Sequence, residues 1–249
     1  MILTIARREF TTMFLSPLAW VILGIMQTIL GYMFLAQLDN YFTLQPQLLN
    51  LKNAPGVTDI VIASLFQLAA VILLMMMPLI TMRTIAEEKR NKTLSLLISS
   101  PISMTEIVLG KFLGLFLFVV VLVSLLMLMP LSLYMGTELD AGKLFSIYLA
   151  MLLLLGSFAA IGLYLSSLTD NQTIAATSTF GALLMLWIID WIGESIADSD
   201  SVVSYLSILQ HHKSMLRGVF DSSDIAYYLI LISAFLVLTI RQLDRERML

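Results

Sequence analysis

Long apolar runs separated by short polar segments dominate this sequence. Six of them reach the length of about 20 residues that a helix needs to cross the hydrocarbon core of a bilayer. They are residues 18–38, 60–82, 107–134, 144–168, 173–192 and 225–243. Unbroken runs such as 119–131 lack the alternation of a membrane β-strand, which favours helices. The pattern predicts an all-α membrane protein with six transmembrane helices in one domain, residues 1–249.

The first 15 residues predict a short amphipathic helix. Leu3, Ala6, Phe10 and Phe14 recur near helical spacing, while charged side chains fall on other faces. Such a helix lies in the membrane interface, and Pro17 breaks it before the first crossing. The interfacial residues of interest are Arg7, Arg8, Glu9 and Phe10. The alternative is a positively charged flank that only sets topology.

Composition and charge support a membrane protein and set its orientation. Hydrophobic residues make up 59% of the chain and charged residues 12%, whereas a soluble domain has about 25% charged residues. Ten Lys and Arg residues lie on the side of both termini and four on the other side, which predicts cytoplasmic termini. The net charge of −3 argues against a nucleic-acid partner, and the absence of cysteine excludes disulfides and thiolate metal sites.

Charged residues are densest between residues 83 and 106, in the predicted cytoplasmic loop. Glu88 and Lys92 stand four residues apart in the order that stabilises a helix. Leu94, Leu97 and Ile98 then form a small apolar face. Because an exposed apolar face beside charges is typical of a protein docking site, we expect a partner to bind here. The alternative is a solvated loop whose basic residues only fix topology.

Polar residues at the next helix start and within the spans carry further predictions. Ser103 and Glu106 have the spacing of a capping box, which predicts a helix start after Pro101. Lys111 is expected to snorkel to the cytoplasmic surface. Gln27 and Gln67 are expected to bond between helices, and the stretch 156–162 is rich in small residues suited to close helix packing.

Eleven positions between residues 83 and 111 follow one pattern: Arg83, Ile85, Ala86, Glu88, Thr93, Leu94, Leu97, Pro101, Glu106, Gly110 and Lys111. This pattern resembles the cytoplasmic loop of ABC-2 type transporter permeases. Two positions depart from it, because the family's usual Gly-Thr is Lys92-Thr93 and its usual Glu-Arg is Glu88-Lys89. In that family the loop holds a coupling helix that sits in a cleft of the ATP-binding subunit. The resemblance implies the docking residues Arg83, Glu87, Glu88, Thr93, Leu94, Leu97 and Pro101.

The resemblance extends to both ends of the chain. The N-terminal stretch resembles the family's interfacial elbow helix, and residues 211–228 resemble its segment before the last helix. The external stretch 193–224 is predicted to form a short re-entrant lid, with the possible gate residues Leu206, Leu209, Arg217, Gly218 and Phe220. A folded external loop without a gating role is the alternative. Within the family the chain looks closest to the gliding-motility-associated permeases.

The resemblance implies a permease subunit in the bacterial inner membrane. It would couple ATP hydrolysis by a separate ATP-binding subunit to export or to mechanical work. The chain lacks the G-x-x-x-x-G-K-[ST] pattern of a P-loop, so ATP and Mg²⁺ are expected on the partner, with no catalytic residue, cofactor or metal in this chain. The expected partners are that subunit, a second permease copy or homologue forming a dimer, membrane lipids and a large extracytoplasmic subunit.

Three other function classes are compatible with a membrane protein of this kind. A secondary transporter would need ionisable residues at mid-membrane or inverted repeats, and neither signal is clear. A non-translocating structural subunit stays open. An intramembrane hydrolase could use Glu87-Glu88 with His211-His212, but these clusters are predicted on opposite membrane faces. Because reacting groups must lie within about 3 Å of a common atom, this class is disfavoured.

Overall fold

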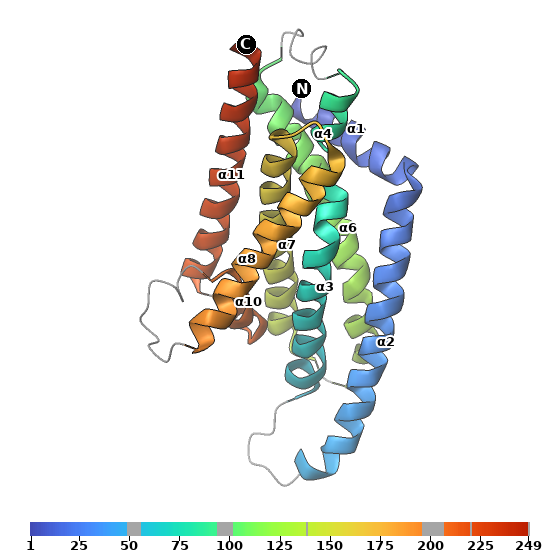
Figure 1. The fold of residues 1–249 in the computed structure, drawn as a ribbon. Helices are drawn as coiled ribbons and strands as arrows, with labels where there is room; N and C mark the ends of the chain where they lie inside the picture. The colour runs from blue at the N-terminus through green and yellow to red at the C-terminus, as the bar shows by residue number, and fades with distance from the viewer. Residues whose placement is uncertain (49–55, 94–101, 138, 196–206, 220, 249) are drawn as a thin grey trace.

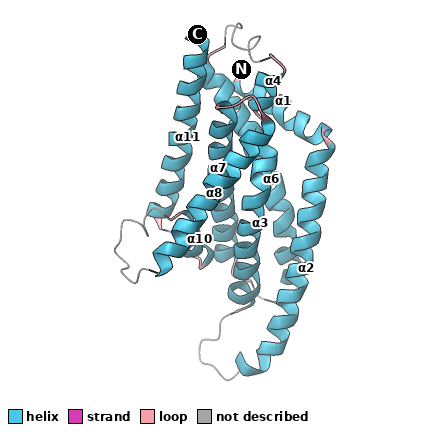
Figure 2. Cartoon of the chain, in the orientation of Figure 1, coloured by secondary structure: helices cyan, strands magenta, loops and turns pink. Residues whose placement is uncertain are grey.

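The computed structural model describes residues 1–48, 56–93, 102–137, 139–195, 207–219 and 221–248 (Figure 1). The regular elements in this part of the chain are all helical (Figure 2). They are α1 (Ile2–Leu15), α2 (Pro17–Leu48), the π-helix η1 (Thr58–Ile62), α3 (Ala63–Thr81), α4 (Ala86–Arg90), α6 (Met104–Ser132), the 3₁₀ helix η2 (Leu133–Met135), α7 (Ala141–Ser167), α8 (Gln172–Ser195), α10 (Ile208–Leu216) and α11 (Ser222–Met248). Six of the described helices are long and apolar enough to cross a membrane, which confirms the predicted fold class.

The helix boundaries follow local signals that were legible in the sequence, with one clear exception. Ser16 adopts an extended conformation between α1 and α2, as expected from Pro17. The predicted capping box at α6 is confirmed, because the Ser103 hydroxyl accepts from the Glu106 N–H and the Glu106 carboxylate accepts from the Ser103 N–H, both at 3.2 Å. The exception is α2, which continues to Leu48, ten residues beyond the end of the first apolar run at residue 38. Pro46 lies in the final turn of α2, where its missing N–H removes only one backbone hydrogen bond, so the helix tolerates it.

α7 forms the centre of the bundle. Within its 18-residue apolar stretch, 78% is buried, whereas the corresponding stretches of α2, α8 and α11 are 28%, 17% and 22% buried. It packs against α3, α6, α8, α10 and α11. The small residues between 156 and 162 lie in this buried region, and a Cβ added at Gly162 would come within 2.3 Å of the Thr81 hydroxyl on α3. The prediction of close helix packing is therefore confirmed.

The two ends of the bundle differ in charge. Both termini and α4 lie together at one end, and α10 lies toward the other (Figure 1). The basic residues that were assigned to the cytoplasmic side belong to α1, the region of α4, the start of α6 and the end of α11. These segments meet at what we term the α4 end. The uneven distribution of basic residues in the sequence thus corresponds to the two opposite ends of the bundle.

α10 is held at the opposite end by polar contacts to its backbone. The Ser146 hydroxyl of α7 donates to the Met215 carbonyl at 2.7 Å, and the Tyr228 hydroxyl of α11 donates to the Ile208 carbonyl at 2.6 Å. Of the gate candidates, Leu209 is buried, Arg217 is exposed and Gly218 has a positive φ of 82°. Leu206 and Phe220 lie outside the described residues. The re-entrant lid stays a prediction.

Gln27 and Gln67 have different outcomes. The Gln27 amide donates to the Leu125 carbonyl at 3.3 Å and joins α2 to α6, as expected. Gln67 is exposed on α3, and no hydrogen bond joins its side chain to another described residue. The expected interhelical bond is therefore present for Gln27, whereas none is found for Gln67 among the described residues.

Candidate functional site

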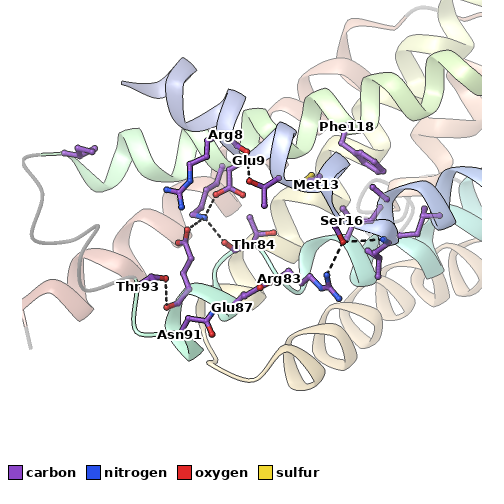
Figure 3. Close-up of a pocket in the computed structure, with 18 residues that line it drawn as sticks. Arg8, Glu9, Met13, Ser16, Arg83, Thr84, Glu87, Asn91, Thr93 and Phe118 are labelled. Carbon is purple, nitrogen blue, oxygen red and sulfur yellow. Dashed lines mark hydrogen bonds and ion pairs between the residues drawn. The ribbon is translucent and has the colours of Figure 1, made fainter.

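A cavity in the described part of the chain lies at the α4 end. It has a volume of about 690 Å³ and is enclosed by α1, the start of α2, the end of α3, α4 and the start of α6 (Figure 3). Ligand pockets typically span roughly 300–1,000 Å³. Its lining includes residues that the sequence assigned to two separate roles, namely Arg8 and Glu9 of the interfacial helix and Arg83, Glu87, Glu88 and Thr93 of the docking loop. Tertiary structure merges these two predicted sites into one.

Lys111 ties the walls of this cavity together. Its ammonium lies 2.7 Å from a carboxylate oxygen of Glu9 on α1 and 2.8 Å from one of Glu88 on α4. It also donates to the Thr84 carbonyl at 2.8 Å. Lys111 is 1% exposed, so the expectation that it snorkels to the surface was wrong. The reason is that α1, α4 and the turn before α4 cover the residue and supply three oxygen acceptors, which satisfy the charge without water.

α4 ends in a backbone conformation that the sequence did not favour. The Thr93 N–H donates to the Glu88 carbonyl and the Lys92 N–H donates to the Lys89 carbonyl, both at 3.0 Å. This is a Schellman motif, which needs a left-handed residue after the helix. Lys92 occupies that position with a φ of 56°. The family pattern described in the sequence analysis has glycine at this position. The helix therefore stops before Lys92, and the Glu88 carboxylate binds Lys111 instead of supporting a longer helix.

Further polar contacts join α4 to the far side of the bundle. The Ser166 hydroxyl of α7 accepts from the Ile85 and Ala86 N–H groups at 3.2 and 3.1 Å and so caps the start of α4. The Lys89 ammonium donates to the Ser167 carbonyl and forms an ion pair with Glu246 of α11. The sequence analysis missed these contacts, because serines at the end of an apolar helix carry no specific signal.

Two glycines seat α1 on α6. A Cβ added at Gly110 would come within 2.7 Å of the Ile5 Cβ, and one at Gly114 would come within 2.6 Å of the Glu9 Cβ. The backbones of α1 and α6 can approach this closely because both positions lack a side chain. The four-residue spacing of Gly110 and Gly114 is the small-x-x-x-small pattern of close helix contacts, a signal that the sequence carries.

The remaining predicted residues divide by exposure. Arg83 is exposed, and its guanidinium contacts the Ser16 hydroxyl at 3.5 Å. Glu87 and Phe10 are half-buried, and Arg7, Arg8 and Thr93 are exposed. Leu94, Leu97 and Pro101 lie outside the described residues. The structure thus brings together four of the seven predicted docking residues and leaves the apolar part of that prediction undescribed.

The residues considered for hydrolysis lie far apart. Glu87 and Glu88 belong to α4, whereas His211 and His212 belong to α10 toward the other end of the bundle (Figure 1). His211 lies 2.6 Å from an Asp224 carboxylate oxygen. Burial, aided by the charge of Lys213, lowers the pKa of His212 to about 4. These positions argue against one acid–base centre.

A protein-family model described as ABC-2 family transporter protein matches residues 3–248, which is almost the whole chain. Comparison with curated proteins gave no match. The family match covers both the α4 region and the helices that enclose the cavity. It does not separate the gliding-motility group from other members, so that assignment stays a prediction.

Proposed function

Since the chain belongs to the ABC-2 transporter family, as a multi-pass transmembrane subunit of an ABC transporter, we propose that a separate ATP-binding subunit docks on residues 83–101 and drives it. ATP and Mg²⁺ would bind to that partner. The chain itself has no P-loop sequence. The family's reliance on an ATP-binding subunit supports the proposal, and the surroundings of α4 supply a mechanism.

The observation that carries the proposal is the attachment of α4 to four helices. Lys111 links it to α6 and, through Glu9, to α1. Ser166 links it to α7, and Glu246 links it to α11. A force on α4 must therefore move these helices with it or break several charged or buried hydrogen bonds. Because α7 is the packed centre of the bundle, motion at α4 has a direct route into the core.

The docking face follows from the burial of α4. Ile85 and Ala86, at the start of α4, are fully buried in the bundle. The residues at its other end, from Arg90 to Thr93, are exposed and lead directly into residues 94–101. In the sequence, the apolar Leu94 and Leu97 follow directly after these charged and polar residues. Apolar residues next to polar ones are typical of protein interfaces.

We further propose that the α4 end faces the cytoplasm of a bacterial inner membrane and that two permease copies form the working unit. The excess of basic residues at this end supports the orientation. Exposed apolar side chains on α2, α8 and α11 offer surface for lipid or for the second copy. The chain lacks cysteine, so a cysteine placed at Asn91 and one at Thr137 can be labelled separately with an impermeant thiol reagent. Reaction at Asn91 from outside the cell would invert the orientation.

The docking proposal is tested by copurification and ATPase activity. The double variant Glu87→Lys/Leu97→Asp should lose the copurifying ATP-binding subunit and its stimulation, while eluting as a folded protein. The control is Met135→Asp, which places an acid at a fully exposed apolar residue at the opposite end. Copurification of the ATP-binding subunit at wild-type levels by the double variant would reject the docking assignment.

A further inference from the structure

The helix α4 is too short to hold its own position. It comprises the five residues Ala86–Arg90, whereas isolated helices shorter than about 12–15 residues are marginal in water. Tertiary contacts must therefore fix it. Ser166 caps its start, and Lys111 binds a carboxylate near its middle. The end of α4, which leads into residues 94–101 of the proposed docking stretch, depends on what binds Lys89.

Lys89 joins α4 to two other helices. Its ammonium donates to the Ser167 carbonyl at the end of α7 and forms an ion pair with the Glu246 carboxylate near the end of α11. The C-terminal end of α11 and α4 lie at the same end of the bundle (Figure 1). The Lys89 and Glu246 side chains are 12% and 28% exposed, so the pair is partly shielded from water. We therefore expect its strength to lie at the upper end of the range for surface ion pairs.

Glu246 is the charged residue of its turn that reaches α4. Gln242, one turn earlier, donates its side-chain amide to a Glu246 carboxylate oxygen at 3.2 Å and so orients the carboxylate. Leu243 is fully buried and seats this part of α11 on the bundle. Asp244 and Arg245, in the same turn, form no ion pair with another described residue. The contact with Lys89 is therefore specific to the place of Glu246 on the helix.

We propose that Glu246 is a positioning residue for docking of the ATP-binding subunit, an inference that rests on the function proposed above. Through Lys89, Glu246 holds the end of α4 in the orientation from which the docking stretch continues. Without this contact, the end of α4 would have to be ordered when the partner binds, and that cost would weaken docking. The last turns of α11 thus belong to the docking site, although Glu246 lies 157 positions from Lys89 in the chain.

Hydrogen exchange of the purified full chain tests the local role without any partner. The Asn91 N–H donates to the Glu87 carbonyl at 2.9 Å, so exchange in peptides that cover residues 86–93 reports the order of the end of α4. Glu246→Gln should raise this exchange about fivefold and leave Tm close to that of the wild type. The matched control Asp244→Asn removes a carboxylate charge from the same turn and should exchange like the wild type. Unchanged exchange in Glu246→Gln, or an equal increase in the control, would overturn the proposal.

Titration with the ATP-binding subunit separates positioning from turnover. With Glu246→Gln, half-maximal ATPase stimulation should need about fivefold more ATP-binding subunit, while the maximal stimulation is kept. Lys89→Met should have an effect at least as large, because it also loses the contact with the Ser167 carbonyl. Adding Glu246→Gln to Lys89→Met should cause no further loss, because the two side chains act through one contact. Additive losses would overturn the role of Glu246 through Lys89.

Failure of this proposal differs from failure of the docking proposal. If no ATP-binding subunit copurifies with the wild type, the docking proposal fails, and hydrogen exchange, which needs no partner, still decides whether Glu246 orders α4. If the wild type docks the ATP-binding subunit and Glu246→Gln docks it equally well, docking stands and the positioning role is overturned.

Discussion

Replacing Lys111 by methionine removes the charge that joins α1, α4 and α6. Methionine keeps the length and most of the apolar volume of the lysine stem, so the change is mainly electrostatic. Three acceptors lose their donor: the carboxylates of Glu9 and Glu88 and the Thr84 carbonyl, all within 2.8 Å of the ammonium. The two carboxylates are 17% and 16% exposed, so water compensates them poorly.

The expected loss is large for a single side chain. Breaking a buried ion pair by removing one partner destabilises a protein by about 3–5 kcal/mol, because the other charge stays buried without a partner. One oxygen of Glu88 is already buried without a hydrogen bond among the described residues. The site is therefore poorly able to accommodate a second unpaired carboxylate oxygen. For a chain of this size, about 3–5 kcal/mol lowers Tm by roughly 6–20 °C.

The assay is thermal unfolding of the purified protein in one detergent at one scan rate, followed by tryptophan fluorescence. Lys143→Met is the matched control, because Lys143 also pairs with a carboxylate, that of Asp59 at 2.9 Å, but with side chains 31% and 37% exposed. That surface pair should contribute at most about 1 kcal/mol. The contrast between the two lysines isolates the effect of burial.

A neutral triple variant completes the test. Glu9→Gln/Glu88→Gln/Lys111→Met removes all three charges and should recover most of the stability lost in Lys111→Met, because no unpaired charge remains. A Tm of Lys111→Met within about 1 °C of the wild type would refute the reasoning. So would a triple variant less stable than the single one.

Three further variants probe close packing, backbone strain and pH. Gly114→Ala should destabilise the protein by about 1–3 kcal/mol by pushing Glu9 and α1 off α6, whereas Gly24→Ala, which meets no atom within 4 Å, should be neutral or stabilising in thermal unfolding. Lys92→Gly should stabilise the end of α4 by about 1 kcal/mol, seen as slower local hydrogen exchange, because it relieves the positive φ of 56°; unchanged exchange there would contradict this. Below pH 6.5 the unfolded His212 takes up a proton that the folded residue, with its pKa lowered to about 4, does not. Stability should therefore fall as pH drops from 6.5 to about 4, with about 2 kcal/mol lost at pH 5, and His212→Leu should lack this part of the pH dependence.

The sequence determined the features that depend on local patterns. Six long apolar runs predicted six membrane helices, Pro17 predicted the break after α1, and Ser103 with Glu106 predicted the start of α6. The pattern between residues 83 and 111 pointed to the family that the match over residues 3–248 then showed. These signals are legible because hydrophobic transfer, proline geometry and capping act over one or two turns of chain.

Only the tertiary structure decided how the polar residues pair. Lys111 was expected at the surface, yet it lies under α1 and α4 with Glu9 and Glu88, which are 102 and 23 positions away in the chain. Ser166 caps a helix about 80 residues before it. A charge near a helix end has the same sequence signature whether it meets water or a carboxylate. Which of the two it meets depends on which other segments fold over it, and that is a property of the assembled bundle.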